Sequence, residues 1–336
     1  MSTPYSIDFV AQLFRVTVLH PSIGLVVLPI LYAFQVDTDS WIAYYSIRYL
    51  VALVIIYVVH ATWLRIKRRK KLQWEEQIVV ITGGASGIGQ ILAELLAIRQ
   101  VTVVVLDRNP IETQQSNIIY HQCDVSDPKQ VESAAKKIIK EVGHPTVLVN
   151  NAAVVDGKLL TELSVEEIQD VVGTNFTSNL WTIKQFLPNM IKNNRGHIIT
   201  MSSALSLAGC PQAGVYSATK SAVYTLHEAL RQEIVSRHCA DKINVSLFCL
   251  GHVNTGLFNG VYFPWPFITP TLEPIHVVKV IIDVLDRDES QTIYMPLYVH
   301  LMPVMKMMPN WVNQIAYKVM GANNAMKTWK KPERSH

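Results

Sequence analysis

A short apolar run that leads through a glycine-rich turn into a helix constrains this chain more than any other feature. Residues 77–81 (QIVVI) are predicted to form a buried parallel strand, residues 82–89 (TGGASGIG) the turn, and residues 90–98 an amphipathic helix. Glycines let a backbone approach a pyrophosphate closely, and the N–H groups at the start of the helix then face the phosphates. The pattern therefore predicts a dinucleotide-binding α/β fold.

The next predicted strand, residues 101–106, ends at Asp107, eighteen positions after Gly89. A carboxylate at this place can accept hydrogen bonds from both ribose hydroxyls of an adenosine, and it repels a 2′-phosphate. This favours NAD(H), while the neighbouring Arg108 keeps NADP(H) open. The alternative for Asp107 is a turn residue before Asn109-Pro110.

Tyr216 and Lys220 are four residues apart in a helix expected over residues 215–237, so their side chains share one face. An unperturbed phenol has a pKa of about 10 and is a poor base at neutral pH. A lysine ammonium nearby favours the phenolate, which can then take the proton of a substrate hydroxyl. Such a pair alone is more often a surface pair, so the prediction depends on the motifs around it.

Those motifs together resemble the short-chain dehydrogenase/reductase family over roughly residues 76–290. The turn matches TGxxxGxG, residues 216–220 match YxxxK, and Ser203 lies thirteen positions before Tyr216. Residues 150–153 (NNAA) match the family's NNAG stretch, with alanine as the last residue. The resemblance implies a three-layer Rossmann-type doubly wound parallel sheet.

The resemblance also implies the roles of individual residues. Ser203 would hold the substrate oxygen, in preference to Ser202, whose spacing to Tyr216 is fourteen. Lys220 would bind the nicotinamide ribose as well, and Asn175 would hold a water that passes the proton towards solvent. The expected catalytic residues are Asn175, Ser203, Tyr216 and Lys220, and the expected cofactor-binding residues are Thr82, Gly83, Ser86, Gly87, Ile88, Gly89, Asp107, Asp124, Val125, Asn151, Ala152, Tyr216, Lys220, Val253 and Thr255.

The sequence departs from the family at Leu250, where a proline is expected before the nicotinamide-side loop 251–255. Without the proline φ is free at this position, so a looser loop is expected. Beyond it, residues 258–267 contain five aromatic side chains. They form a candidate apolar lid for a lipophilic substrate, and ordinary packing of a loop onto the core is the alternative.

Two apolar segments, at about 16–36 and 41–64, precede a basic run at 65–71. Each is about twenty residues long, enough for a hydrocarbon core of ~30 Å. Prolines in the first segment make a re-entrant or interfacial helix its alternative, and buried helices of a soluble domain are the alternative for both. We expect an N-terminal transmembrane helical region, with the basic run and all that follows on the cytosolic side.

The net charge is +4, but six basic residues lie in that one run and the rest of the chain is near neutral, which argues against nucleic-acid binding. The four cysteines form no CxxC pair, so reduced thiols are expected and no metal site. The expected domains are a membrane anchor (1–71), a catalytic domain (72–290) and an apolar, basic C-terminal extension (291–336). The extension either lies on the membrane surface or packs on the core.

This layout resembles the membrane-bound retinol and 17β-hydroxysteroid dehydrogenase branch of the family. That implies hydride transfer between NAD(P) and a lipophilic alcohol or carbonyl of retinoid, steroid or fatty-alcohol type. Membrane lipid is expected as a partner, and a homodimer through the helices that contain Asn175 and Tyr216. The endoplasmic reticulum is favoured over the lipid droplet and the mitochondrial outer membrane. The alternatives are an NADPH-dependent reductase of a 3-oxo lipid intermediate, and a non-catalytic membrane or lipid-droplet scaffold that keeps the fold.

Overall fold

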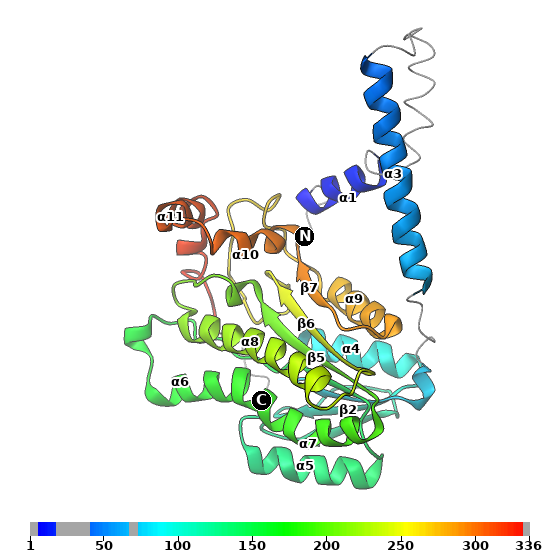
Figure 1. Cartoon of the computed structure of the whole chain (residues 1–336). Helices are drawn as coiled ribbons and strands as arrows, with labels where there is room; N and C mark the ends of the chain where they lie inside the picture. The colour runs from blue at the N-terminus through cyan, green and yellow to red at the C-terminus, as the bar shows by residue number, and fades with distance from the viewer. Residues whose placement is uncertain (1–5, 18–40, 67–72, 332–336) are drawn as a thin grey trace. The chain divides into compact units, whose positions relative to one another are not determined.

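The computed structural model describes residues 6–17, 41–66 and 73–331 (Figure 1) and divides the chain into two compact units, one within residues 4–71 and one within residues 72–336. In the first unit, Ile7–Thr17 (α1) and Trp41–Ile66 (α3) are helices. Helix α3 spans the second apolar segment, whereas most of the first segment lies outside the described residues. Over the residues that are described, no helix combines the length and apolarity needed to cross a membrane, so the transmembrane prediction is not confirmed.

The second unit is built on a parallel sheet, which has seven strands within the described residues. Its order is β3-β2-β1-β4-β5-β6-β7, which confirms the predicted doubly wound topology (Figure 1). The strands are short, mostly β-branched runs, and those inside the sheet are buried on both faces, as expected of a parallel sheet. They are β1 (Ile78–Thr82), β2 (Thr102–Asp107), β3 (Ile118–Gln122), β4 (Val147–Asn150), β5 (Gly196–Ser203), β6 (Ile243–Leu250) and β7 (Thr292–Met295).

Helices cover both faces of the sheet. Helices α4 (Gly87–Ile98) and α9 (Pro274–Arg287) pack on one face, and α5 (Pro128–Glu141), α7 (Ser178–Asn193) and α8 (Gly214–Ser236) pack on the other. The remaining helices are α6 (Val165–Val172), α10 (Met302–Met305) and α11 (Asn310–Val319). A π-helical turn, Gly173–Thr177, joins α6 to α7.

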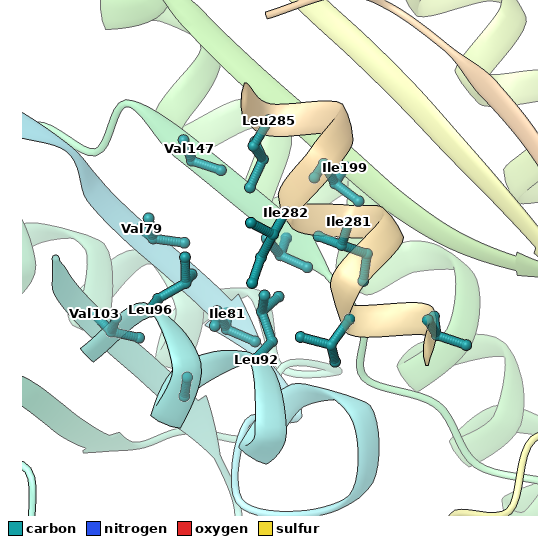
Figure 2. Packing of buried hydrophobic residues seen from close by; sticks show 14 of the residues in the cluster. Val79, Ile81, Leu92, Leu96, Val103, Val147, Ile199, Ile281, Ile282 and Leu285 are labelled. Atoms are coloured by element: carbon teal, nitrogen blue, oxygen red, sulfur yellow. The ribbon is translucent and has the colours of Figure 1, made fainter. Parts of the chain in front are cut away.

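Alternating side chains of each strand enter two separate cores. On one face, Val79 and Ile81 of β1 pack with Leu92 of α4 and Ile282 of α9 (Figure 2). Val80, between them in sequence, belongs to the core on the opposite face. Each fully buried aliphatic side chain contributes roughly 1.5–3 kcal/mol relative to an exposed one, so these two clusters hold the sheet rigid beneath the site.

The chain order places a crevice at the carboxyl ends of β1 and β4. These strands are neighbours, with Val80 paired to Leu148, yet α4 leads from β1 over one face and α7 packs on the other. Ligands of doubly wound sheets bind where the strand order reverses in this way. The glycine turn after Thr82 and the asparagines at 150–151 both lie at these carboxyl ends.

The structure moves several predicted boundaries. Helix α4 begins at Gly87 rather than residue 90, because Ser86 already has the extended backbone of an N-cap residue. Strand β7 pairs with β6 in parallel, so the sheet continues beyond residue 290 into the predicted C-terminal extension. Residues 292–295 have intermediate burial, which fits an edge strand.

Candidate active site

The glycine turn forms one end of a cavity of about 950 Å³. Gly83 has φ +65°, and a Cβ there would lie 2.7 Å from the Cα of Ala152, so only glycine fits. Ser86 caps α4 without a side-chain hydrogen bond to the first N–H groups of the helix. Since Ser86, Gly87 and Ile88 line the cavity, this helix terminus suits the pyrophosphate of a dinucleotide.

Behind the turn, Thr82 and Asn151 hold β1 and β4 at a set spacing. Thr82 Oγ1 accepts hydrogen bonds from the backbone N–H groups of Asn151 (3.0 Å) and Ala152 (3.1 Å). Asn151 Nδ2 donates to the carbonyl oxygens of Gly83 (2.9 Å) and Thr82 (3.1 Å). Gly89 is packed against the same carbonyl of Gly83, where a Cβ would clash. Thr82 and Gly89 therefore shape the turn from behind, whereas Gly83 and Asn151 line the cavity.

The end of the cavity expected to hold the adenosine contains Asp107 and an arginine, Arg108, that is held by two carboxylates. Asp107 accepts hydrogen bonds from the N–H groups of Ala85 and Asn109, both at 3.0 Å, and lines the cavity. Arg108 Nη2 donates to Asp124 Oδ1 and to Asp170 Oδ1, each at 2.9 Å. Burial acts to raise the pKa of Asp124, but hydrogen bonds from Ser126 and Arg108 outweigh it and the pKa is lowered. Asp124 thus contacts Arg108 and does not line the cavity.

The structure brings the predicted catalytic side chains Ser203, Tyr216 and Lys220 together. All three line the cavity, and at most 7% of any of them is exposed. Lys220 Nζ lies 5.7 Å from the centroid of the Tyr216 ring and donates one hydrogen bond to the carbonyl of Met201 (2.8 Å). The hydroxyl of Ser203 interacts with the phenol of Tyr216. Ser202, which also lines the cavity, donates to the backbone carbonyl of Lys220 (3.1 Å).

Burial governs the acidity of this pair. It raises the pKa of Tyr216 to about 12, with Asp156 adding to the rise and the Ser203 hydroxyl opposing it. Burial also lowers the pKa of Lys220 to about 8. Burial therefore opposes formation of the phenolate, and the help expected from the Lys220 ammonium stays a prediction. Removal of each group from water disfavours its charged form.

The predicted cofactor-binding residues fall into two groups, those that line the cavity and those that lie behind it. Those that line the cavity are Gly83, Ser86, Gly87, Ile88, Asp107, Val125, Asn151, Ala152, Tyr216, Lys220, Val253 and Thr255. Thr82, Gly89 and Asp124 lie behind it. The residues present fit a nicotinamide dinucleotide, because helix N–H groups without a side-chain cap, the Asp107 carboxylate and the buried Lys220 all line a single cavity.

The family model for short chain dehydrogenase matches residues 77–262. The chain belongs to the short chain dehydrogenase family. It is 31% identical over 250 residues to epidermal retinol dehydrogenase 2 of Homo sapiens, covering 71% of this chain and 80% of that protein. It is 32% identical over 239 residues to estradiol 17-beta-dehydrogenase 11 of Rattus norvegicus, covering 68% and 79% respectively.

A solved structure, 3-ketoacyl-(acyl-carrier-protein) reductase from Brucella melitensis, has a TM-score of 0.59 and 20% identity, covering 66% of this chain and 98% of that chain. That likeness shows the fold alone. The sequence relatives place this dehydrogenase in the retinol and 17β-hydroxysteroid dehydrogenase-like branch. It is an oxidoreductase that acts on CH–OH groups with an NAD(P) nucleotide and a small-molecule substrate.

Asn175 of the dehydrogenase is buried in the π-helical turn between α6 and α7. Its Oδ1 accepts from the N–H of Val154, and its Nδ2 donates to the carbonyl of Val154, both at 2.8 Å. The same Nδ2 approaches Thr219 Oγ1 of the catalytic helix at 3.3 Å. The side chain therefore fastens the 152–154 segment to α8, and its predicted hold on a relay water stays a prediction.

The nicotinamide-side loop of the dehydrogenase is held at several points despite Leu250. Leu250 is the last residue of β6, is buried, and its carbonyl accepts a hydrogen bond from Ser203 Oγ (3.4 Å). Gly251 N–H donates to the carbonyl of Met295 (2.7 Å), and Asn254 N–H donates to that of Leu272 (2.9 Å). Backbone pairing with neighbouring segments restrains the loop, and its expected loosening stays a prediction.

Asp156 and Trp329 are among the cavity residues that the sequence did not predict. Asp156 is buried, and its Oδ2 accepts from the N–H of Val215 (3.2 Å) at the start of the catalytic helix. Its place six residues after Asn150 could have drawn attention to it. Trp329 lines the cavity from the far end of the chain. Nothing in its local sequence indicates that role, because only the tertiary fold brings it there.

Proposed function

We propose that this dehydrogenase transfers a hydride between NAD(H) and a lipophilic alcohol or carbonyl of retinoid, steroid or fatty-alcohol type. The observation that carries the proposal is the convergence of Ser203, Tyr216 and Lys220 in the cavity that the glycine turn opens. The relatives, a retinol dehydrogenase and an estradiol dehydrogenase, support a lipophilic substrate class.

In the proposed mechanism, Ser203 donates a hydrogen bond to the substrate oxygen and Tyr216 exchanges the hydroxyl proton. The nicotinamide supplies the hydride acceptor or donor and, when oxidised, a positive charge that favours the phenolate. With a pKa of about 12, Tyr216 is protonated at neutral pH and is ready to act as the acid in carbonyl reduction. Lys220 has donors beyond its bond to Met201 and faces the cavity, so it can orient a ribose.

The preference for NAD(H) rests on the charges at the adenosine end. Asp107 lines the cavity where a 2′-phosphate would lie, and it would repel that group. Arg108, the nearest basic candidate for such a phosphate, is shared between Asp124 and Asp170. A guanidinium that already pairs with two carboxylates gives little to a third anion, so we assign NADP(H) as the weaker cofactor.

Apolar side chains line the cavity near the phenol. Val155, Phe258 and Trp329 pack against the cluster that contains Tyr216, and the Phe258 ring meets the Tyr216 ring edge-to-face at 5.4 Å between centroids. Pockets of this composition bind hydrocarbon through its area and leave orientation to a few polar groups. The lining supports a lipophilic alcohol over a hydroxylated sugar.

We also propose that the enzyme is bound to a membrane, with its catalytic domain facing the cytosol and the endoplasmic reticulum as the favoured location. Helix α3 exposes large apolar side chains, among them Tyr45, Ile56 and Val59. The basic run at 65–71 supports the cytosolic orientation through the positive-inside rule. Such exposed apolar surface is rare on soluble monomers and is typical of lipid contact.

Turnover with both cofactors tests the proposed function. Purified full-length enzyme in detergent should reduce NAD⁺ with long-chain or polycyclic alcohols. Tyr216→Phe should lower kcat by about 10²- to 10⁴-fold, the range for loss of a general acid–base. The variant should still bind NADH, as measured by fluorescence titration.

Tyr224→Phe is the matched control, because Tyr224 lies on the same helix but does not line the cavity. Its hydroxyl is hydrogen-bonded to the hydroxyl of Tyr294. It should keep most of its turnover. A wild-type enzyme that acts on no lipid alcohol or carbonyl would contradict the proposal. Faster turnover of a 3-oxo lipid with NADPH would favour the reductase alternative, and a cellular role that survives Tyr216→Phe would favour the scaffold.

A further inference from the structure

The C-terminal segment 322–331 is hydrogen-bonded to residues 257–260, which follow the nicotinamide-side loop 251–255 in the chain. Three consecutive residues make these bonds. Thr328 Oγ1 donates to the carbonyl of Gly260 (2.6 Å), Trp329 Nε1 donates to that of Leu257 (3.1 Å), and Lys330 N–H donates to that of Asn259 (2.9 Å). Residues 257–260 and the C-terminal segment therefore lie side by side and together form one wall of the cavity, although about seventy residues separate them in sequence.

Two glycines shape that wall for close contact. At Gly157 a Cβ would collide with the ring of Trp329, and at Gly260 a Cβ would collide with the carbonyl of Thr328. Both glycines have positive φ, +68° and +80°, which side chains rarely adopt. The indole thus lies directly on the backbone of residue 157, one position after Asp156, which is bonded to the start of the catalytic helix.

The same segment reaches the reacting group. Met326 is 3% exposed and lies in one apolar cluster with Tyr216, Ala213 and Cys210, against which Phe258 and Trp329 pack. Trp329 also lines the cavity that contains Tyr216, Ser203 and Lys220. The indole therefore forms part of the cavity wall beside Tyr216. In the proposed reaction, the hydrocarbon next to the alcohol carbon would lie against this wall.

We propose that Trp329 is a specificity-determining residue, and that the wall formed by residues 322–331 selects alcohols with a flat or linear hydrocarbon next to the carbinol over bulky branched ones. This rests on the proposed function. The indole is rigid, held by its bond to Leu257 and seated against Gly157, so it cannot move aside without breaking both contacts. An aromatic face of this kind packs well on extended or planar hydrocarbon and excludes tetrahedral branching.

The test compares kcat/KM of the full-length enzyme for a linear long-chain alcohol, a planar polycyclic alcohol and a bulky branched alcohol, with NAD⁺ saturating. Trp329→Ala should reduce the ratio of linear to branched kcat/KM at least tenfold, mainly through KM for the alcohol. Trp329→Phe should retain most of the selectivity. The KM for NAD⁺ should change by less than twofold in both variants, because Trp329 lies at the substrate end.

Trp311→Ala is the control for loss of an indole, since Trp311 lies on α11, is 67% exposed and does not line the cavity. It should leave the ratio unchanged. An unchanged ratio in Trp329→Ala, alongside normal wild-type turnover and normal NADH binding, overturns this inference and leaves the proposed function standing. Absence of wild-type turnover on all three alcohols overturns both. A variant that no longer binds NADH is replaced by Trp329→Leu, judged by the same ratio.

Discussion

At the scale of single residues, burial sets the acidity of Tyr216 and Lys220, the proposed catalytic pair. The four-residue spacing of Tyr216 and Lys220 was sufficient to predict that they share a helix face. It was not sufficient to predict that both are almost wholly removed from water, which moves the pKa of the phenol up and that of the lysine down. Burial therefore disfavours the phenolate of Tyr216 and the ammonium of Lys220, although a pKa of about 8 still leaves the lysine mostly protonated at neutral pH.

Lys220 should make stability depend on pH. Its folded pKa is about 8, below its ordinary value of 10.5, so the unfolded chain binds more protons between these two pH values. Stability should rise with pH across this window. Relative to Lys220→Met, the nucleotide-free wild type should gain roughly 3 kcal/mol between pH 8 and 10.5, at 1.36 kcal/mol for each pKa unit.

Urea unfolding followed by tryptophan fluorescence at several pH values checks this. The exposed Lys136→Met is the matched control, and its difference from wild type should be flat. A difference between wild type and Lys220→Met that does not change with pH would show that the lysine is hydrated in the folded state.

At the scale of elements, three segments meet at one guanidinium. Arg108 follows β2, Asp124 follows β3, and Asp170 lies in α6, and the two ion pairs join them beside the adenosine end of the cavity. A parallel sheet brings the carboxyl ends of β2 and β3 to one edge, which is why these residues are close. The partner in α6 was not predicted, because it depends on how the connection between β4 and α7 folds back.

Partial release of Arg108 should weaken the discrimination between cofactors. Asp170→Asn removes one of its two carboxylate partners and leaves the guanidinium freer to meet a 2′-phosphate. Because the pair is about one-third exposed, the effect should be small, about two- to fivefold tighter binding of NADPH with little change for NADH.

Fluorescence titration with each reduced cofactor measures it, and the exposed Glu166→Gln on the same helix controls for loss of a negative charge. Equal changes in NADH and NADPH affinity would mean that Arg108 does not act on the 2′ position.

At the scale of the whole molecule, each unit presents apolar side chains to its surroundings. In the catalytic unit these side chains lie on the loop 258–267, on the turn between α10 and α11, and on α11. The loop and α11 are in contact, because Trp265 Nε1 donates to the carbonyl of Val319 (2.7 Å). Tyr262, Trp265, Met307 and Trp311 are each more than half exposed. Mixed aromatic and methionine surface of this kind suits the boundary between headgroups and acyl chains.

Brominated lipids should therefore quench Trp311 in the reconstituted full-length enzyme. Trp311→Phe should reduce the quenched fraction of tryptophan fluorescence, because one lipid-contacting fluorophore is lost. Trp181→Phe, on α7 and packed against the core, should not reduce it. Identical quenching in wild type and Trp311→Phe would indicate that this face contacts protein or solvent instead.

Local sequence determined the parts of this protein that depend on neighbours along the chain: the strand, glycine turn and helix at residues 78–98, and the shared face of Tyr216 and Lys220. These follow from φ, helical period and strand alternation, which act over a few residues. Only the tertiary structure decided the pKa directions of the dyad, the pairing of Arg108 with Asp170, and the presence of Trp329 in the substrate wall. Burial and long-range contacts depend on how distant segments pack, and no local pattern encodes them.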